Sequence, residues 1–282
     1  MNISAERLKK IKAIAIDLDG TALLPDTTLG EHTIKVLKEL IKRNFQIIIC
    51  TGRAIIASER YRTAIGAEGA MVYHNGAEVV DMPSGTILTT VLLKNTVVDF
   101  CVDIARSMGL HYQVYLSPSG PGNPEILATE KYTDEAEMYR LHTGLVPLIQ
   151  DIKTIISAPE PRSCIKGMFL CEPSFHDEIR QNLIKQFGDT IYITRTYPTF
   201  LEVMTAGVSK GEGLKIAMKY RGLNAESVLA AGDEENDLLM LKAAGLSAAP
   251  SNARENVKAA ADFIFRSNAE EGLALFLEEQ LL

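Results

Sequence analysis

The sequence predicts a doubly wound α/β fold with a parallel sheet, interrupted by a separate α+β domain. At both ends of the chain, short β-branched segments alternate with segments of helical period, as in a parallel sheet with crossover helices. In the middle, hairpin and loop chemistry replaces this alternation. The length of 282 residues suits about two domains. We therefore predict a core made of residues 1–83 and 195–282, with residues 84–194 inserted between its halves.

The first part of the core alternates strands and helices. Residues 11–16 are apolar and β-branched, which predicts a short buried strand. Thr28 and Glu31 have the spacing of a capping box at the start of a helix that runs to Arg43. This order of elements predicts neighbouring parallel strands. It continues with a strand at 46–50, a helix at 54–64 and a strand at 70–73.

The middle of the chain has a different pattern. Over residues 77–91, two short strand patterns flank a Pro-Ser-Gly turn, which is typical of a hairpin. A helix is predicted at about 96–108, and residues 117–124 have the composition of a loop. Strands are predicted at 165–171 and 191–194. The mixture indicates an α+β unit.

The α/β alternation returns near residue 200. Ser209 and Glu212 have capping-box spacing and predict a helix to Arg221, followed by a buried strand at 228–231. These elements complete the core. The remaining ones are helices at 238–243, 253–260 and 270–281, with short strands near 246–248 and 263–265.

Two acidic motifs follow predicted strands directly. Asp17 and Asp19 follow the first strand, and Asp233 and Asp237 follow the strand at 228–231. In an open parallel sheet, ligands bind beyond the carboxyl ends of the strands. Close carboxylates repel unless they share a proton or a cation, and Mg²⁺ prefers oxygen ligands of this kind. We therefore expect a divalent metal here; the alternative is a pair of solvated acidic turns.

Further polar residues could bind an anion at the same edge of the sheet. Thr51 and Gly52 follow the second strand, where a hydroxyl and an open backbone form an anion cradle, or simply a helix cap and a turn. Lys210 begins its helix, where a cation suits a bound anion, although a surface lysine is the alternative. Asn236 adds a neutral donor or ligand. Asn75 precedes a glycine and is either a substrate contact or part of a hairpin turn.

Taken together and in order, these motifs resemble those of the haloacid dehalogenase (HAD) superfamily of phosphohydrolases. The insertion lies between the second and third motifs, and the segment Phe-Leu-Glu-Val at 200–203 precedes the third. Both features resemble the Cof-type subfamily with a large α/β (type IIB) cap. The resemblance covers nearly the whole chain and implies a Rossmann-like core with an inserted α+β cap. The matching residues are Asp17-Leu18-Asp19-Gly20-Thr21, Thr51, Lys210 and Gly232-Asp233 with Asn236-Asp237.

The resemblance implies a role for each matching residue. Asp17 would be the nucleophile that forms an aspartyl-phosphate, Asp19 the general acid and base, and Lys210 the partner of Asp17 and the phosphate. In the Thr-Gly-Arg segment, Ala54 stands where the family often has proline. The substrate would be bound by Thr51, Gly52, Arg53, Asn75, Lys210 and Asn236. Mg²⁺ would be held by Asp17, the Asp19 backbone carbonyl, Asp233 and Asp237.

The expected function is a Mg²⁺-dependent phosphatase for small phosphorylated metabolites, with sugar phosphates as one candidate class. A phosphomutase would use the same aspartyl-phosphate but return the phosphoryl group to the substrate. A phospho-acceptor switch also combines Asp, Thr, Lys and a metal, although it needs neither a leaving-group acid nor a cap. A non-catalytic binding module is disfavoured because no motif position is lost. The cap residues that select the substrate are not visible in the sequence.

The composition disfavours other classes of protein. There are 29 basic and 36 acidic residues, a net charge of −7, which argues against a nucleic-acid partner. The longest apolar runs are far shorter than the ~20 residues that span a bilayer. The four cysteines form no Cys-x-x-Cys pair and lie mostly in apolar runs, which predicts reduced thiols in a cytoplasmic protein. The oligomeric state cannot be deduced.

Overall fold

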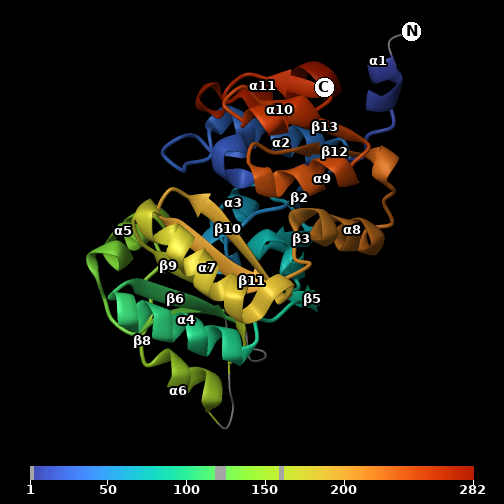
Figure 1. Ribbon diagram of the computed structural model, residues 1–282. Coiled ribbons are helices and arrows are strands. Elements are labelled where there is room, and N and C mark those ends of the chain that lie inside the picture. The colour runs from blue at the N-terminus through green and yellow to red at the C-terminus, as the bar shows by residue number, and fades with distance from the viewer. Residues whose placement is uncertain (1–2, 118–124, 159–161) are drawn as a thin grey trace. The chain divides into compact units, whose positions relative to one another are not determined.

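The computed structural model describes residues 3–117, 125–158 and 162–282 (Figure 1). The loop predicted at 117–124 lies, after its first residue, outside the described residues. The chain divides into two compact units. The first unit consists of Met1–Arg53, Ser58–Thr89 and Ser209–Leu282, and the second of Ala54–Ala57 and Thr90–Val208.

A five-stranded parallel sheet of order β14-β13-β12-β1-β2 forms the centre of the first unit. Residues 13–16 are fully buried, as expected for a parallel strand covered on both faces. This sheet confirms the predicted parallel α/β core. Its strands are β1 (Ala13–Ile16), β2 (Gln46–Ile49), β12 (Val228–Ala231), β13 (Leu246–Pro250) and β14 (Phe263–Phe265).

Helices pack on this sheet. Side chains from α8, α9 and α10 form one apolar cluster with Ala13 and Ala15 of β1. Because side chains alternate along a strand, Ile14 and Ile16 point to the opposite face. Helix α2 contacts β2 and α11. The helices are α1 (Ile3–Leu8), α2 (Glu31–Lys42), α3 (Ile55–Ile65), α8 (Lys210–Tyr220), α9 (Leu238–Ala243), α10 (Glu255–Ala260) and α11 (Gly272–Leu281).

The strand predicted at 70–73 belongs to a different sheet. β3 (Gly69–Tyr73) pairs antiparallel with β4 (Glu78–Met82), and β5 (Thr86–Thr90) completes this three-stranded sheet. A single parallel bridge between Cys50 and Val72 links β3 to the chain that follows β2. The regular ladder of β3 therefore runs antiparallel to β4, and its other edge meets the parallel sheet only at this bridge, where Thr51 N donates to Val72 O at 2.9 Å. The predicted strand is confirmed, but it is not a full member of the parallel sheet.

The start of α2 is capped by a residue from near the C-terminus. Thr33 donates to Glu271 Oε2 from its backbone N at 2.7 Å and from its Oγ1 at 3.0 Å. The residue that precedes the helix is Gly30, which has no side chain to cap it. Thr28, predicted to be the cap, instead bonds Asp26 Oδ1 through both its backbone N and its hydroxyl. The predicted capping box is wrong, because the first turn needs only an acceptor and a distant carboxylate supplies it.

The second unit contains a six-stranded sheet of order β10-β11-β9-β6-β7-β8, antiparallel except for the β7–β8 pair. Helices α4, α6 and α7 share a buried apolar cluster with this sheet. The strands are β6 (His111–Leu116), β7 (Ile126–Thr129), β8 (Leu148–Ile149), β9 (Cys164–Leu170), β10 (Ile191–Tyr197) and β11 (Phe200–Thr205). The helices are α4 (Asn95–Met108), α5 (Asp134–Thr143), α6 (Ile152–Ser157) and α7 (His176–Phe187).

The boundaries between the units differ from the predicted ones. We predicted them at 83/84 and 194/195, whereas the compact units divide at 89/90 and 208/209. The first predicted boundary separates β4 from β5, and the second cuts through β10, which pairs with β11. A strand pattern shows where a strand lies along the chain but not which sheet it joins. The predicted boundaries therefore fall within the β4–β5 and β10–β11 hairpins.

Within the described parts of the chain, no helix combines the length and apolar character needed to cross a membrane. The four cysteines, Cys50, Cys101, Cys164 and Cys171, are buried free thiols. Burial raises the pKa of the Cys171 thiol to about 11, which keeps it protonated near neutral pH.

Candidate active site

The sequence motifs meet at one edge of the parallel sheet of the first unit. Asp17 follows β1 immediately, Thr51 lies two residues after β2, and Asp233 lies two residues after β12. These three strands are neighbours and run in the same direction, so their carboxyl ends share one edge. Lys210 is the first residue of α8.

Lys210 is the charged centre of this site. Its Nζ donates to Asp17 Oδ1 and to Asp237 Oδ1, both at 2.7 Å, and its side chain is only 2% exposed. The second oxygen of Asp237 accepts from the backbone N of Asp233 and of Glu234, each at 3.0 Å. The strand β1, the helix α8 and the turn after β12 are therefore joined through one buried ion-pair network.

Asp17, Asp233 and Asp237 form a buried group of oxygen donors. One carboxylate oxygen from each lies within 4.8 Å of those from the other two. If all three acids are ionised and Lys210 carries its proton, the group has a net charge of −3 + 1 = −2. Hard divalent cations prefer oxygen ligands, and two positive charges would compensate this excess. The residues therefore fit Mg²⁺. Asp19 contributes no side-chain oxygen to this group.

Burial controls the protonation of these side chains. Burial raises the pKa of Asp17 well above its usual value, Lys210 opposes this shift, and the neighbouring carboxylates add to it. Burial and the charge of Asp237 raise the pKa of Asp233 to about 7. For Lys210, burial acts against the charge, but Asp17 and Asp237 outweigh it and raise the lysine pKa. The raised pKa values show that Lys210 alone does not compensate the negative charge of the buried acids. A bound cation would provide the missing positive charge.

Asp19 pairs with Arg53. The guanidinium donates from Nε to Oδ2 at 2.7 Å and from Nη2 to Oδ1 at 2.6 Å, a bidentate arrangement. The Arg53 side chain is buried, whereas that of Asp19 is 47% exposed. We predicted that Arg53 binds the substrate. In the structure, its guanidinium also contacts Asp19 and orients that carboxylate. The two residues are 34 positions apart, so no local pattern could reveal it.

A left-handed turn places the Asn-Gly pair beside the predicted anion-binding residues. All three residues of His74–Gly76 have positive φ, at 49°, 56° and 97°. Asn75 N donates to Thr51 O at 3.0 Å, and Asn236 Nδ2 donates to Asn75 Oδ1 at 2.9 Å. A Cβ at Gly52 would lie 2.8 Å from Asn75 Oδ1, so a side chain there would clash. This arrangement brings Thr51, Gly52, Asn75 and Asn236 together.

The same turn forms the hairpin loop between β3 and β4, as one of our two alternatives for Asn-Gly predicted. A Cβ at Gly76 would lie 2.0 Å from Ser209 O, so this close approach to the start of α8 requires glycine. Ser209 Oγ accepts from Glu212 N at 3.1 Å, which confirms the predicted N-cap. The turn therefore packs against Ser209, the residue that precedes Lys210.

One polar atom of this group has no partner among the described residues. Asn236 Oδ1 is buried, and no donor in the described chain lies within hydrogen-bonding distance of it. Buried polar atoms of proteins are nearly always hydrogen-bonded, so such an atom is suited to a bound ligand or water. This observation supports the prediction that Asn236 faces the reacting group.

Sequence reasoning missed three residues that support the site. Thr21 Oγ1 donates to Asp233 Oδ1 at 2.7 Å. Asn252 Nδ2 donates to Gly20 O at 2.9 Å, and Asn268 Nδ2 donates to Leu23 O at 2.7 Å. Thr21 belongs to the first motif, which is a signal that could have identified it. The two asparagines carried no signal, because each lies more than 200 residues from its partner.

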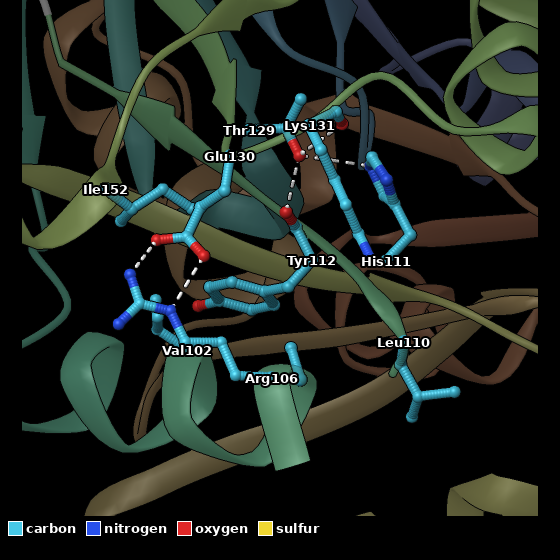
Figure 2. A pocket seen from close by; sticks show the side chains of 10 residues that line it. Val102, Arg106, Leu110, His111, Tyr112, Thr129, Glu130, Lys131 and Ile152 are labelled. Carbon is cyan, nitrogen blue, oxygen red and sulfur yellow. Dashed lines mark hydrogen bonds and ion pairs between the residues drawn. The ribbon is translucent and has the colours of Figure 1, made fainter. Parts of the chain in front are cut away.

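A cavity in the second unit contains none of the predicted site residues. It is lined by side chains of α4 and α6, the start of β6 and the end of β7. Figure 2 shows Arg106 turned toward Glu130, where Nε donates to Oε2 at 2.9 Å, and Thr129 turned toward the backbone oxygen of Tyr112. Arg106 and Glu130 at this cavity form an ion pair, in contrast to the surplus of negative charge in the first unit.

The fold and this site define a hydrolase of the α/β class with an inserted cap. Residues 14–277 match the family of haloacid dehalogenase-like hydrolases, and the chain belongs to that family. Its membership agrees with the motif order and with the carboxylate–lysine network described above.

Known proteins resemble the chain over nearly its whole length. The pyridoxal phosphate phosphatase YbhA of Escherichia coli is 25% identical over 284 residues, which cover 96% of this chain and 99% of that protein. The crystal structure of a haloacid dehalogenase-like hydrolase from Bacteroides thetaiotaomicron has a TM-score of 0.85 and 25% identity, covering 95% of this chain and 99% of that one. A HAD subclass IIB sugar phosphatase shares the fold, with a TM-score of 0.75 and 22% identity over 95% and 98% of the two chains. The inserted unit agrees with the predicted type IIB cap.

Proposed function

We propose that this hydrolase is a Mg²⁺-dependent phosphatase for small phosphorylated metabolites, sugar phosphates among them, and that it acts through an aspartyl-phosphate at Asp17. The observation that carries the proposal is the position of Lys210, at 2.7 Å from both Asp17 and Asp237 within a group of three buried carboxylates. A phosphoryl group would add negative charge to this group, so its binding requires a lysine and a cation. The relative named as a pyridoxal phosphate phosphatase supports a small phosphate monoester as substrate.

Mg²⁺ would be held by the carboxylates of Asp17, Asp233 and Asp237 together with the backbone carbonyl of Asp19. When bound, it supplies positive charge to the phosphoryl oxygens and helps to orient them. Thr21 already fixes one oxygen of Asp233 at 2.7 Å. That contact would keep the carboxylate in one orientation toward the ion.

In the proposed reaction, the Asp17 carboxylate attacks phosphorus as the bond to the leaving oxygen breaks. The carboxyl group of Asp19 gives its proton to that oxygen, so the product leaves as an alcohol. In the second step, ionised Asp19 takes a proton from the water that attacks the aspartyl-phosphate, which restores both aspartates. Arg53 orients Asp19 through its two hydrogen bonds.

The remaining residues would bind and stabilise the phosphoryl group. Lys210 is held by two carboxylates and stays protonated, so it is positioned to offset charge on the equatorial oxygens. Thr51 Oγ1 accepts from Arg53 N at 3.1 Å, which leaves the hydroxyl proton for a phosphoryl oxygen. Asn75 orients the amide of Asn236. A set of preorganised donors of this kind lowers the barrier without any movement during the reaction.

The proposal is tested by phosphate release from p-nitrophenyl phosphate by the purified full-length protein. We expect turnover with Mg²⁺, loss of turnover with EDTA, and recovery when Mg²⁺ is added in excess. Glu235→Gln is a matched control, since Glu235 is an exposed acid in the same turn as Asp237 and should be dispensable. No hydrolysis of any phosphate monoester in the presence of Mg²⁺ would contradict the proposal.

A panel of phosphorylated metabolites would then define the substrate class. Sugar phosphates and pyridoxal phosphate are the first compounds to include, with inorganic phosphate and sugar isomers both measured as products. Release of inorganic phosphate identifies a phosphatase. Conversion of one sugar phosphate into its isomer without phosphate release would identify a phosphomutase instead.

A further inference from the structure

The loop that carries Asp19 is not held by a regular hydrogen-bond ladder. Within residues 18–22, Asp19 has an extended ψ of 126° and Gly20 a left-handed φ of 74°, so the turn is irregular. A backbone bond from Leu23 N to Leu18 O at 2.8 Å closes the turn. Other parts of the chain must therefore determine where Asp19 lies.

On one side, the loop rests against Asp233. A Cβ at Gly20 would lie 2.2 Å from Asp233 Oδ2, which together with the positive φ explains the glycine. Thr21 Oγ1 donates to the same carboxylate at 2.7 Å. This contact links the loop to the acidic group but does not restrain the carbonyl groups on its other side.

Two asparagines from the C-terminal part of the chain bind those carbonyls. Asn252 Nδ2 donates to Gly20 O at 2.9 Å, and Asn268 Nδ2 donates to Leu23 O at 2.7 Å. The asparagines are themselves connected, since Asn268 N donates to Asn252 Oδ1 at 3.0 Å. Asn268 is buried, with 9% of its surface exposed. The two amides therefore fix the loop at a carbonyl next to Asp19 and at its end.

We propose that Asn252 and Asn268 are positioning residues that hold Asp19 where it can protonate the leaving group. The inference rests on the proposed function, in which Asp19 is the general acid. Without the Asn252 amide, the Gly20 carbonyl loses the bond that restrains it, and the backbone that carries Asp19 is held less firmly while Arg53 still contacts its carboxyl group. A displacement of about 1 Å at a catalytic group can cost about 100-fold in rate.

Misplacement of a general acid has a distinct kinetic signature. A stable anion such as p-nitrophenolate needs little protonation to leave, whereas phenolate needs more, so loss of the acid slows phenyl phosphate preferentially. The two esters have similar shapes, so binding differences are small. The value of kcat/KM covers only the steps up to cleavage of the ester bond, and a fall in the folded fraction lowers both values equally. The ratio of the two therefore reports the acid alone.

The experiment measures kcat/KM with both esters for wild type, Asp19→Asn, Asn252→Ala and Asn268→Ala. Asp19→Asn should lower the value for phenyl phosphate, relative to p-nitrophenyl phosphate, by about 100-fold, the scale of general acid catalysis. The two asparagine variants should lower the same ratio by about 10-fold, since the acid is displaced but present. Asn256→Ala, an exposed asparagine of α10, should leave the ratio unchanged.

An unchanged ratio in both asparagine variants, beside a shifted ratio in Asp19→Asn, would overturn the positioning role and leave the proposed function intact. An unchanged ratio in Asp19→Asn would show that Asp19 is not the acid, and the inference would fall with it. Asn252→Asp replaces Asn252→Ala if the latter does not fold. It keeps the shape and the acceptor for Asn268 N but loses the donor to Gly20 O, and should shift the ratio in the same direction.

Discussion

Each of the two units buries a lysine against a carboxylate, but the surroundings of the two pairs differ. Lys210 lies 2.7 Å from Asp17 in the first unit, and Lys166 lies 2.7 Å from Glu202 in the second; both lysine side chains are 2% exposed. In the second unit, Thr196 Oγ1 donates to Glu202 Oε1 at 3.1 Å. Lys166 Nζ also lies 5.0 Å from the centre of the Tyr115 ring, a favourable cation–π distance.

The surroundings of Lys210 are instead dominated by negative charge. It contacts two carboxylates, and a third completes the group of Asp17, Asp233 and Asp237. Within the described parts of the chain, no other group of three or more acids, histidines or cysteines lies close enough to hold a metal. A buried ion pair by itself therefore does not indicate a binding site. A buried excess of negative charge does indicate one, because a cation from solution must compensate it.

The largest expected effect is on catalysis. Asp17→Asn removes the proposed nucleophile and should lower phosphate release by about 10⁴-fold or more, which is the scale seen when one member of a catalytic set is removed. The measurement is kcat with p-nitrophenyl phosphate, on protein shown to be folded by circular dichroism. Full activity of Asp17→Asn would contradict the assignment of Asp17.

The second prediction concerns the pair in the second unit. Glu202→Gln leaves Lys166 buried with its neighbouring negative charge removed, and should destabilise the protein by about 3–5 kcal/mol. The double variant Lys166→Met with Glu202→Leu should recover most of this loss, since a well-packed apolar pair avoids the desolvation cost. Thermal and urea unfolding would measure both. A single variant as stable as wild type would show that this pair is not structural.

A third prediction separates the two units by their response to the metal. Mg²⁺ at about 100 times its Kd should stabilise wild type by about 2.7 kcal/mol, and the thermal midpoint should rise accordingly. Asp233→Asn should lose most of this gain, while Glu202→Gln should retain it from a lower starting stability. If Mg²⁺ stabilised wild type and Asp233→Asn equally, the ion would have to bind elsewhere.

The smallest expected effect is on the stability of the metal-free protein. Asp17→Asn removes one of three buried like charges while Asp237 still pairs with Lys210, so stability should rise by about 1 kcal/mol. Unfolding in EDTA, compared with wild type under the same conditions, measures the difference. A loss of several kcal/mol would mean that the Asp17–Lys210 pair is structural, like the pair of Lys166 and Glu202.

Much of the candidate site could be predicted because its residues lie next to strands that are easy to recognise. Asp17, Thr51 and Asp233 follow short apolar runs, and the geometry of a parallel sheet brings such positions to one edge. The contact between Arg53 and Asp19 could not be predicted in this way. It depends on the direction of two side chains from separate loops, and the resemblance placed Arg53 at the substrate because it completes the Thr-Gly-Arg segment of the family.

The same distinction holds for the fold. The α/β core and the insertion could be recognised from alternating patterns, and the cap of α8 by Ser209 from local spacing. The cap of α2 could not, because Thr28 bonds Asp26 and the acceptor for Thr33 is Glu271. The observed unit boundaries differ from the predicted ones for a related reason. Hydrogen bonds between strands determine which sheet β5 and β10 join.

The order of the elements, the parallel core and the types of residue at the carboxyl edge of its strands can all be deduced from the sequence. These follow from periodicity and from chemistry at strand ends, both of which are local. The folded structure is needed to show which groups pair: Lys210 with two aspartates, Arg53 with Asp19, and two distant asparagines with the loop that carries Asp19. The reason is physical, because the strength of charges and hydrogen bonds depends on distance and burial, and both are set by parts of the chain that meet only after folding.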